Sequence, residues 1–290
     1  MTPGVYSYSF IIDGVAVGDP DNVNTVHSTP ALRTFLVPGA AAAFLTPHAG
    51  AHGKLSVLTY HSAVTNSDRS ATVWTPPGYS ASRRAAYPTF YLVHGGGGDY
   101  LDWIQQGDAN AILDNLFAAH RLTPMLVVMP DGNITGSTGL PEDDNFPAEL
   151  LGSLIPAVQR TFHVSANASQ RALAGLSLGG LQTFNTLFDD PGAFREIGDF
   201  SSGYFPTVID QIRAQDAALL QNPAVNKRTS MFRIYIGNQA DIAYQNNILT
   251  RQLFDDLGVH YQFAGSYPKS GHVWKTWQYD LFDFAPRLFG

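Results

Sequence analysis

Apolar, strand-like runs alternate with helix-like segments over most of this 290-residue chain, and that alternation limits the folds that it can adopt. The runs Phe90–Val93 and Met125–Met129 are apolar at every position. Strands with apolar side chains on both faces are typical of a parallel sheet that is covered by helices on each side. We therefore expect an α/β fold with a mostly parallel, eight-stranded sheet flanked by helices.

The expected elements follow one another from residue 55 onward. Strands are expected at Leu55–Ser62, Ser70–Thr75, Thr89–His94, Met125–Pro130, Arg171–Leu176, Glu196–Ser201, Met231–Gly237 and His260–Ser266. Helical spacing is clearest at Ala109–His120, Pro147–Phe162, Leu178–Asp189, Ile242–Leu257 and Trp274–Phe289. The first two strands have no helix between them, so the strand–helix alternation begins only with the third strand.

The beginning of the chain has a different pattern. Tyr6–Ile12 shows the alternation of a strand, Asp13-Gly14 is a hairpin-turn signal, and Val15–Val17 is expected to return as a second strand. A piece of this size is too small to bury a core by itself. We divide the chain into a short β segment at residues 1–36, a surface linker at 37–54 and an α/β domain at 55–290.

Composition narrows the classes of function. The chain has no cysteine, which excludes disulfides, a cysteine nucleophile and cysteine-bound metal. Its 17 Lys and Arg against 24 Asp and Glu give a net charge of −7, which argues against a nucleic-acid or anionic-membrane partner. No stretch approaches the roughly 18 apolar residues of a membrane span. No H-E-x-x-H motif or acidic cluster indicates a metal, so we expect no cofactor.

Gly175-Leu-Ser177-Leu-Gly179 matches the pattern G-x-S-x-G between an expected strand and an expected helix. In that context the pattern predicts a sharp turn that exposes a nucleophilic serine and points the N-terminus of the helix at a developing negative charge. The motif alone also fits a glycine-rich turn with a capping serine. The partners that a serine nucleophile needs therefore have to be found elsewhere in the chain.

Those partners are a base and an acid, and α/β-hydrolases carry them in the order Ser, acid, His. Ser177 follows the fifth expected strand, Asp241 follows the seventh and His272 follows the eighth. Asp241 would orient His272 and stabilise its charged form. Asp199 and Asp216 are weaker candidates for the acid.

The glycine run His94-Gly95-Gly96-Gly97-Gly98 follows the third expected strand and offers backbone N–H groups to a substrate oxygen. We expect an oxyanion hole made by the N–H groups of Leu178 and Gly96, with Gly95 and Gly97 as alternatives for the second donor. Aromatic residues on loops near the same edge are candidates for an acyl pocket, namely Tyr100, Trp103, Tyr204 and Phe205.

Four stretches of the α/β domain are specific enough to compare with a known family. They are Tyr91-Leu-Val-His-Gly-Gly-Gly-Gly, Pro124-Met-Leu-Val-Val-Met-Pro, Arg171-Ala-Leu-Ala-Gly-Leu-Ser-Leu-Gly-Gly and Gly271-His-Val-Trp. Together they resemble carbohydrate esterase family 1, the feruloyl and acetyl-xylan esterases within the esterase D-like α/β-hydrolases. The resemblance implies that Ser177 is the nucleophile, His272 the base and Asp241 the acid. Relatives commonly have two residues between a glycine and the acid, whereas three separate Gly237 from Asp241.

The N-terminal residues carry a second resemblance. Pro3–Gly14, followed by Asp19-Pro-Asp-Asn, is similar to the end of a family 48 carbohydrate-binding module. Only the last part of such a module is present, so we interpret residues 1–36 as a remnant in which sugar binding is not expected. Met1–Tyr6 has no basic region followed by an apolar run, as a signal peptide would have. The resemblance nevertheless implies a secreted or periplasmic protein.

The function that the sequence predicts is that of a serine carboxylesterase. It would hydrolyse hydroxycinnamoyl (feruloyl) or acetyl esters of plant polysaccharides through an acyl-enzyme. The sequence does not decide between the two acyl groups, and it does not indicate the oligomeric state. The enzymatic alternative is a siderophore-ester or thioester hydrolase of the same superfamily. The non-enzymatic alternative is a carbohydrate-binding protein with an inactive hydrolase fold.

Overall fold

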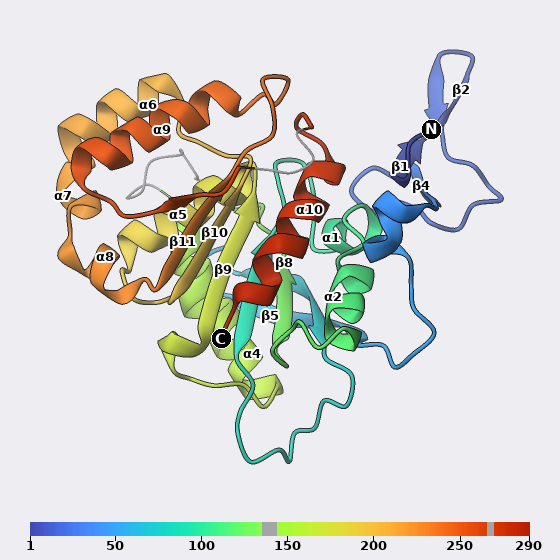
Figure 1. Ribbon diagram of the computed structural model, residues 1–290, viewed down its shortest axis with the longest axis horizontal. Coiled ribbons are helices and arrows are strands. Elements are labelled where there is room, and N and C mark those ends of the chain that lie inside the picture. The colour runs from blue at the N-terminus through green and yellow to red at the C-terminus, as the bar shows by residue number, and fades with distance from the viewer. Residues whose placement is uncertain (135–143, 266–269) are drawn as a thin grey trace.

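The centre of the molecule is an eight-stranded sheet with the order β12-β11-β10-β9-β7-β8-β6-β5 (Figure 1). The computed structural model describes residues 1–134, 144–265 and 270–290. The strands are β5 (Lys54–Ser62), β6 (Ser67–Thr75), β7 (Thr89–Val93), β8 (Leu126–Pro130), β9 (Arg171–Leu176), β10 (Glu196–Phe200), β11 (Met231–Tyr235) and β12 (Gln262–Phe263). Neighbours from β8 to β12 are parallel, and β6 runs antiparallel to both β5 and β8. This confirms the predicted mostly parallel sheet; the expected end of its last strand, Ser266, lies outside the described residues.

Helices follow most of the parallel strands. They are α1 (Asp102–Gln105), α2 (Ala109–Ala118), α3 (Asn145–Glu149), α4 (Ile155–Thr161), α5 (Leu178–Asp189), α6 (Pro206–Gln211), α7 (Ala217–Leu220), α8 (Pro223–Arg228), α9 (Tyr244–Leu257) and α10 (Trp274–Phe284). The helix expected at Pro147–Phe162 is interrupted by a π turn at Leu150–Leu154. Pro156, at the start of α4, lacks the N–H that an unbroken α-helix would donate there.

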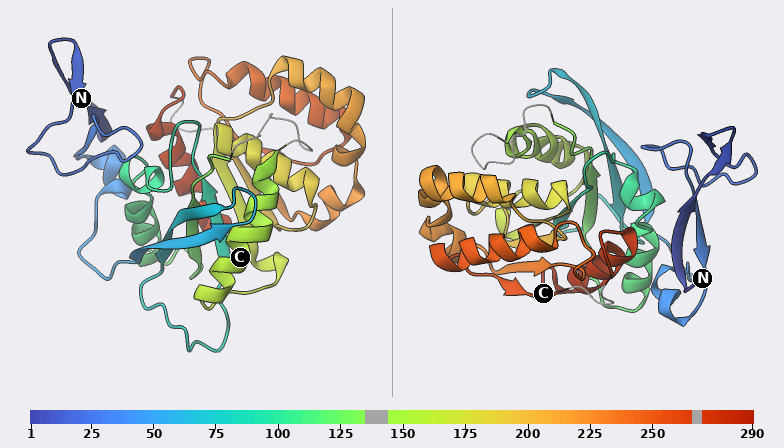
Figure 2. Two further views of the ribbon diagram at one scale, coloured as in Figure 1. Left: turned by 180° about the vertical axis from the view of Figure 1, so that it is seen from behind. Right: turned by 90° about the horizontal axis from the view of Figure 1, so that it is seen from above.

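Two helical layers cover the sheet, one on each face (Figure 2). In β7, Phe90 and Leu92 lie in an apolar cluster with residues of α2 and α10, whereas Tyr91 and Val93 lie in a second cluster with residues of α4, α5 and α9. The side chains of a strand alternate between its faces, so an entirely apolar strand can fill both cores. The carboxyl ends of the parallel strands, and the loops that follow them, lie together at one edge of the sheet between the two layers.

The N-terminal residues form two small antiparallel pairs, of which one lies beside α1 and the other projects away from the α/β part of the molecule (Figures 1 and 2). Strand β1 (Gly4–Tyr8) pairs with β4 (Arg33–Val37), and β2 (Phe10–Ile12) pairs with β3 (Val15–Val17). Asp13 and Gly14 have φ values of 50° and 82°, the positive values that a type I′ hairpin turn requires at its two central positions. The predicted hairpin is thus confirmed, and the β1–β4 pair is an addition that the sequence did not predict.

Residues 37–54, expected to be a surface linker, contain a 3-10 helix at Ala40–Leu45. Leu45 is buried in the cluster of α2 and α10. The Asn115 side chain on α2 donates to the carbonyl of Phe44 at 2.8 Å, and the rings of Phe44 and Tyr279, on α10, lie 4.6 Å apart. This segment therefore covers part of the α2–α10 layer.

Candidate active site

Ser177 lies at the turn between β9 and α5, at the carboxyl edge of the sheet. Its backbone has φ 52° and ψ −117°, a conformation that L residues rarely adopt and that stores strain. A Cβ on Gly175 would lie 2.2 Å from the carbonyl oxygen of Gly179, and a Cβ on Gly179 would lie 2.4 Å from the carbonyl oxygen of His94. The strand, the turn and the helix pack this closely only because both positions are glycine.

Asp241 and His272 come from the loops that follow β11 and β12. Nε2 of His272 lies 3.0 Å from Oγ of Ser177, and Nδ1 of His272 lies 2.8 Å from Oδ1 of Asp241. The ring of Trp277 stands edge-on to the imidazole with its centre 4.9 Å away. The structure thus brings the three predicted residues together in one line from carboxylate through imidazole to hydroxyl.

The side chain of Asp241 is completely buried. Burial alone would raise the pKa of this carboxyl, but hydrogen bonds from His272 and from the Ala243 N–H outweigh it and hold the pKa of Asp241 below its usual range. An ionised carboxylate can only accept hydrogen bonds. Nδ1 of His272 therefore carries the ring proton, which leaves Nε2 able to accept the proton of the Ser177 hydroxyl.

A turn accommodates the additional residue between Gly237 and Asp241. The N–H of Asp241 donates to the carbonyl of Asn238 at 2.9 Å, and the N–H of Asn238 donates to the carbonyl of Ser270 at 2.8 Å. The second bond ties the loop that carries Asp241 to the loop that carries His272. The three-residue spacing is therefore compatible with the contact to His272. Of the three candidate acids, Asp241, Asp199 and Asp216, it is Asp241 that lies at Nδ1 of His272.

Two backbone N–H groups are available beside the hydroxyl of Ser177. Gly96 and Leu178 line the same hollow, and a Cβ on Gly96 would lie 3.9 Å from the Leu178 side chain. Leu178 is the first residue of α5, so its N–H has no partner within the helix. Neither N–H donates to another group in the described part of the chain. The dipole of α5 adds positive potential at this point.

Two hollows adjoin Ser177 and His272 and share the backbone of Gly96. The first, which we name the apolar hollow, has a volume of about 340 Å³ and is lined mainly by Leu178, Leu181, Phe205, Ile242 and Ala243. The second, the polar hollow, has a volume of about 230 Å³ and is lined by Ser28, Thr29, Asp102, Gln106, Trp274 and the glycine run from Gly95 to Gly98. Gly95 and Gly97 thus lie on the polar side, and Phe205 lies on the apolar side.

The structure corrects the expectation that Trp103 and Tyr204 contact substrate. Both side chains are buried in the core. Nε1 of Trp103 donates to the carbonyl of Val93 at 3.0 Å, and the hydroxyl of Tyr204 donates to Oδ1 of Asn185 at 2.8 Å. A buried aromatic residue with a polar tip needs such an internal partner. These two aromatic residues therefore support the loops around the site without lining it.

Tyr100 also lies away from both hollows, since its ring packs beside His27 with the ring centres 5.8 Å apart. Sequence reasoning missed Leu181 and Ile242 as lining residues. Leu181 is one helical turn after Ser177, and this spacing is a signal that places it on the same face of α5. Ser28 comes from the N-terminal segment, and no local pattern indicates that it reaches the site.

In the three described ranges, no group of three or more His, Cys, Asp or Glu side chains is placed to hold a metal ion. Among the same residues, no helix combines the length and the apolar character needed to cross a bilayer.

The sheet order, the helices on both faces and a strained serine hydrogen-bonded to a histidine that pairs with an acid define the class of α/β-hydrolases. Residues 62–288 match the family described as putative esterase. The chain belongs to this esterase family.

Two curated relatives show how the chain compares in sequence. It is 32% identical over 223 residues to the endo-1,4-beta-xylanase/feruloyl esterase of Xylanibacter ruminicola, with 74% of this chain and 31% of the relative covered. It is 25% identical over 250 residues to endo-1,4-beta-xylanase Y of Acetivibrio thermocellus, with 77% of this chain and 22% of the relative covered. The chain thus spans a third or less of the length of these two relatives.

Solved structures share the fold. The feruloyl esterase module from Clostridium thermocellum in complex with sinapinate has a TM-score of 0.72 and 22% identity, covering 87% of this chain and 92% of that one. A ferulic acid esterase from Anaeromyces mucronatus in complex with ferulic acid has a TM-score of 0.70 and 19% identity, covering 85% and 95%. At these identities the likeness shows the α/β-hydrolase fold.

Proposed function

We propose that this chain is a serine carboxylesterase that hydrolyses hydroxycinnamoyl or acetyl esters of plant polysaccharides through an acyl-enzyme. The observation that carries the proposal is the hydrogen-bonded line from Asp241 through His272 to Ser177, which ends between the apolar and the polar hollow. The relative named endo-1,4-beta-xylanase/feruloyl esterase supports the class of substrate.

In the first half of the reaction, Oγ of Ser177 attacks the ester carbonyl while Nε2 of His272 takes the hydroxyl proton. The carbonyl oxygen becomes negative and accepts hydrogen bonds from the N–H groups of Gly96 and Leu178. Asp241 keeps the imidazole oriented and stabilises its positive charge. The C–O bond to the alcohol then breaks, the alcohol oxygen takes the proton from Nε2, and the acyl group stays on Ser177.

In the second half, a water molecule gives a proton to Nε2 of His272 and attacks the acyl carbon. The same two N–H groups stabilise the second oxyanion. The bond to Oγ breaks, Ser177 recovers its proton from His272, and the carboxylic acid leaves. The cycle consumes one water and needs no group beyond those of the chain.

The two hollows suggest where the parts of the ester lie. The apolar hollow suits an aromatic acyl group, because burying apolar surface is worth about 25 cal/mol per Å². Its volume of about 340 Å³ falls within the usual range for small-ligand pockets. The polar hollow, with the Ser28 and Thr29 hydroxyls and the Gln106 amide, suits the sugar alcohol. A secreted or periplasmic location fits such a substrate, because a polysaccharide lies outside the cytoplasm.

The test compares kcat/KM for methyl ferulate and p-nitrophenyl acetate. We expect methyl ferulate to be preferred, and Ser177→Ala to lower kcat by at least about 10⁴-fold with an unchanged circular dichroism spectrum. Ser202→Ala is the matched control, since Ser202 lines the same hollow without a bond to His272. Turnover retained by Ser177→Ala contradicts the mechanism. A preference for the acetyl ester assigns the enzyme to deacetylation, and inactivity on both esters rejects the proposed function.

A further inference from the structure

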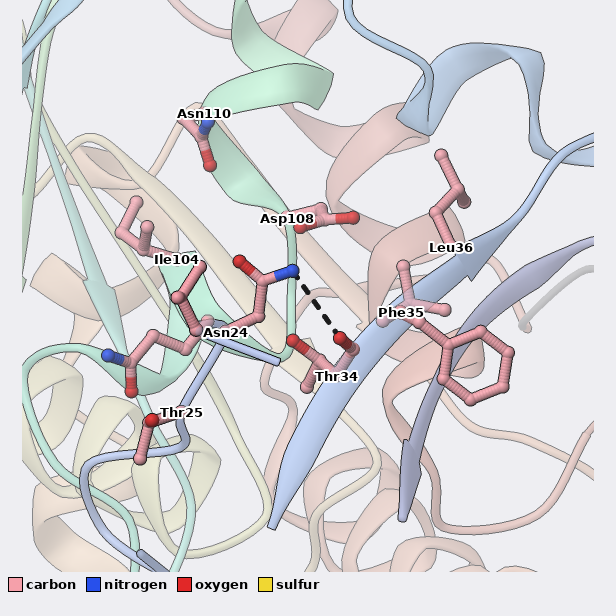
Figure 3. Close-up of a pocket in the computed structure, with 11 residues that line it drawn as sticks. Asn24, Thr25, Thr34, Phe35, Leu36, Ile104, Asp108 and Asn110 are labelled. Atoms are coloured by element: carbon pink, nitrogen blue, oxygen red, sulfur yellow. Dashed lines mark hydrogen bonds between the residues drawn. The ribbon is translucent and has the colours of Figure 1, made fainter. Parts of the chain in front are cut away.

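A third hollow, of about 340 Å³, lies between the N-terminal segment and the start of α2 (Figure 3). Its polar lining residues are Asn24, Thr25, Thr34, Gln105, Asp108 and Asn110. The first three belong to the N-terminal segment and the others to α1, α2 and the turn between them. The hollow therefore exists only because the two parts of the chain pack against each other.

Asp108 is the one titratable residue among those that line this hollow. Its side chain makes no hydrogen bond to the described chain and does not cap α2, although it occupies the N-cap position. Its backbone is in the left-handed region with φ 48°, which is uncommon for a residue other than glycine. Burial raises the pKa of Asp108 to about 7. A strained, partly buried acid with no partner is the kind of group that a ligand satisfies.

The third hollow is next to the polar hollow of the active site. The loop that supplies Thr25 to the third hollow continues into Ser28 and Thr29, which line the polar hollow. This loop is fixed on α1, because the His27 N–H donates to Oε1 of Gln105 at 2.6 Å and the Ser28 hydroxyl donates to Oδ1 of Asp102 at 2.7 Å. The two hollows therefore lie on either side of the contact between this loop and α1.

The chemistry of the lining points to a neutral, polyhydroxylated ligand. Amides and hydroxyls supply both donors and acceptors, and the carboxyl of Asp108 supplies a strong acceptor. Val5, Leu36 and Ile104 add apolar contacts of the kind that suit the C–H faces of a sugar ring. No Lys or Arg lines the hollow, which argues against an anion, and one carboxyl is too few for a dedicated cation site.

We infer that the third hollow binds saccharide units of the substrate beyond the unit that carries the ester. The inference rests on the proposed function, since it takes the polar hollow as the site of the sugar alcohol. Asp108 accepts hydrogen bonds from sugar hydroxyls, while Asn24 and Asn110 donate and accept. The N-terminal segment, in which no sugar binding was expected, then contributes to binding only together with α1 and α2.

Direct binding tests the site independently of catalysis. Xylohexaose is titrated calorimetrically into Ser177→Ala, which cannot turn over an ester. Adding Asn110→Trp, which fills the hollow, should abolish the heat of binding, and adding Asp108→Asn should weaken affinity about fivefold, as expected for one hydrogen bond. Asp68→Asn is the control, since Asp68 is 74% exposed on the edge pair β5–β6. No binding to Ser177→Ala, or equal binding with and without Asn110→Trp, overturns the inference.

Kinetics separates this inference from the proposed function. The readout is the ratio of kcat/KM for a feruloylated xylo-oligosaccharide to kcat/KM for methyl ferulate, which has no saccharide. Asp108→Asn should lower this ratio about fivefold, whereas Asp68→Asn should leave it unchanged. An unchanged ratio in Asp108→Asn and Asn110→Trp overturns the inference while esterase activity stands. Xylohexaose binding that depends on Asn110, in a protein inactive on every ester, rejects the proposed function and keeps the saccharide site.

Discussion

Nδ1 of His94 lies 2.7 Å from the carbonyl oxygen of Gly95, and Nε2 of His94 accepts a hydrogen bond from the N–H of Gly132 at 2.8 Å. Because Nε2 accepts, Nδ1 is the protonated nitrogen and donates to Gly95. The Gly95 carbonyl and the Gly96 N–H belong to one planar peptide and point in opposite directions. The buried imidazole therefore holds this peptide in place, with the N–H of Gly96 pointing away from His94.

This relationship makes His94 a positioning residue for the expected oxyanion hole. His94→Gln keeps a polar group near Nε2 but loses the donor near Nδ1, and we expect kcat for methyl ferulate to fall about 10- to 100-fold with little change in KM. His94→Asn, which keeps an amide N–H near Nδ1, should lose less. A rise in KM at constant kcat in His94→Gln contradicts the assignment, and thermal unfolding checks that both variants are folded.

The backbone strain at Ser177 has a consequence for stability. Ser177→Gly removes the cost of a positive φ, whereas Ser177→Ala keeps it, and both variants lack the Ser177 hydroxyl. Relief of the backbone strain stabilises the glycine variant by about 1–3 kcal/mol. The greater freedom of glycine in the unfolded chain costs about 0.5–1 kcal/mol. We therefore expect the glycine variant to be about 1 kcal/mol more stable than the alanine variant. Urea unfolding measures the difference. Equal stabilities indicate that the backbone at residue 177 is not strained.

The apolar hollow predicts a selective loss of aromatic substrates. The Phe205 side chain lines that hollow although it is 56% exposed, so Phe205→Ala should raise KM for methyl ferulate about tenfold while changing stability little. For p-nitrophenyl acetate, whose acyl group is too small to reach Phe205, KM should change less than about twofold. Phe10→Ala is the control, since Phe10 is similarly exposed on β2, away from the hollow. A parallel loss on both esters places the acyl group elsewhere.

Asp108 predicts how stability depends on pH. The folded protein holds the pKa of Asp108 at about 7, above its value in the unfolded chain of about 3.9. The contribution of Asp108 to the stability of the wild type is therefore fully present below about pH 4 and is lost as the pH rises through about 7. Above that pH, folding places a charged carboxylate where it is poorly hydrated. Asp108→Asn lacks this penalty. It should match the wild type near pH 4 and be more stable at pH 8 by about 1–2 kcal/mol, after allowance for partial exposure.

Thermal unfolding of both proteins across this range gives the measurement. Asp68→Asn serves again as the control, because its carboxyl is exposed and its exchange for an amide should produce no such trend. A difference between Asp108→Asn and the wild type that stays constant from pH 4 to 8 contradicts the raised pKa.

The sequence predicted the sheet well because its strands are continuous apolar runs. The limits of β9 and α5 match the predicted ones at both ends, and the loops after β9, β11 and β12 carry Ser177, Asp241 and His272 as expected. Parallel strands end at one edge, so the order of residues along the chain translates directly into proximity.

Other features depend on contacts that no local pattern reveals. The partner of β1 is β4, which lies beyond a long irregular loop, and the loop residues around Ser28 reach the active site through bonds to α1. Trp103 and Tyr204 are aromatic residues on loops, and sequence alone does not indicate whether such a side chain turns outward to substrate or inward to a buried carbonyl or amide.

The family match starts at residue 62, the last residue of β5, but the physical unit starts earlier. Strand β5 pairs with β6 over its whole length, and the 3-10 helix at Ala40–Leu45 covers α2 and α10. A recombinant fragment cut at residue 62 would expose the edge of β6 and an aromatic surface on α10, both of which promote aggregation. Fragments made for expression should therefore begin before Ala40, since the stretch that a sequence comparison recognises is shorter than the stretch that has to fold.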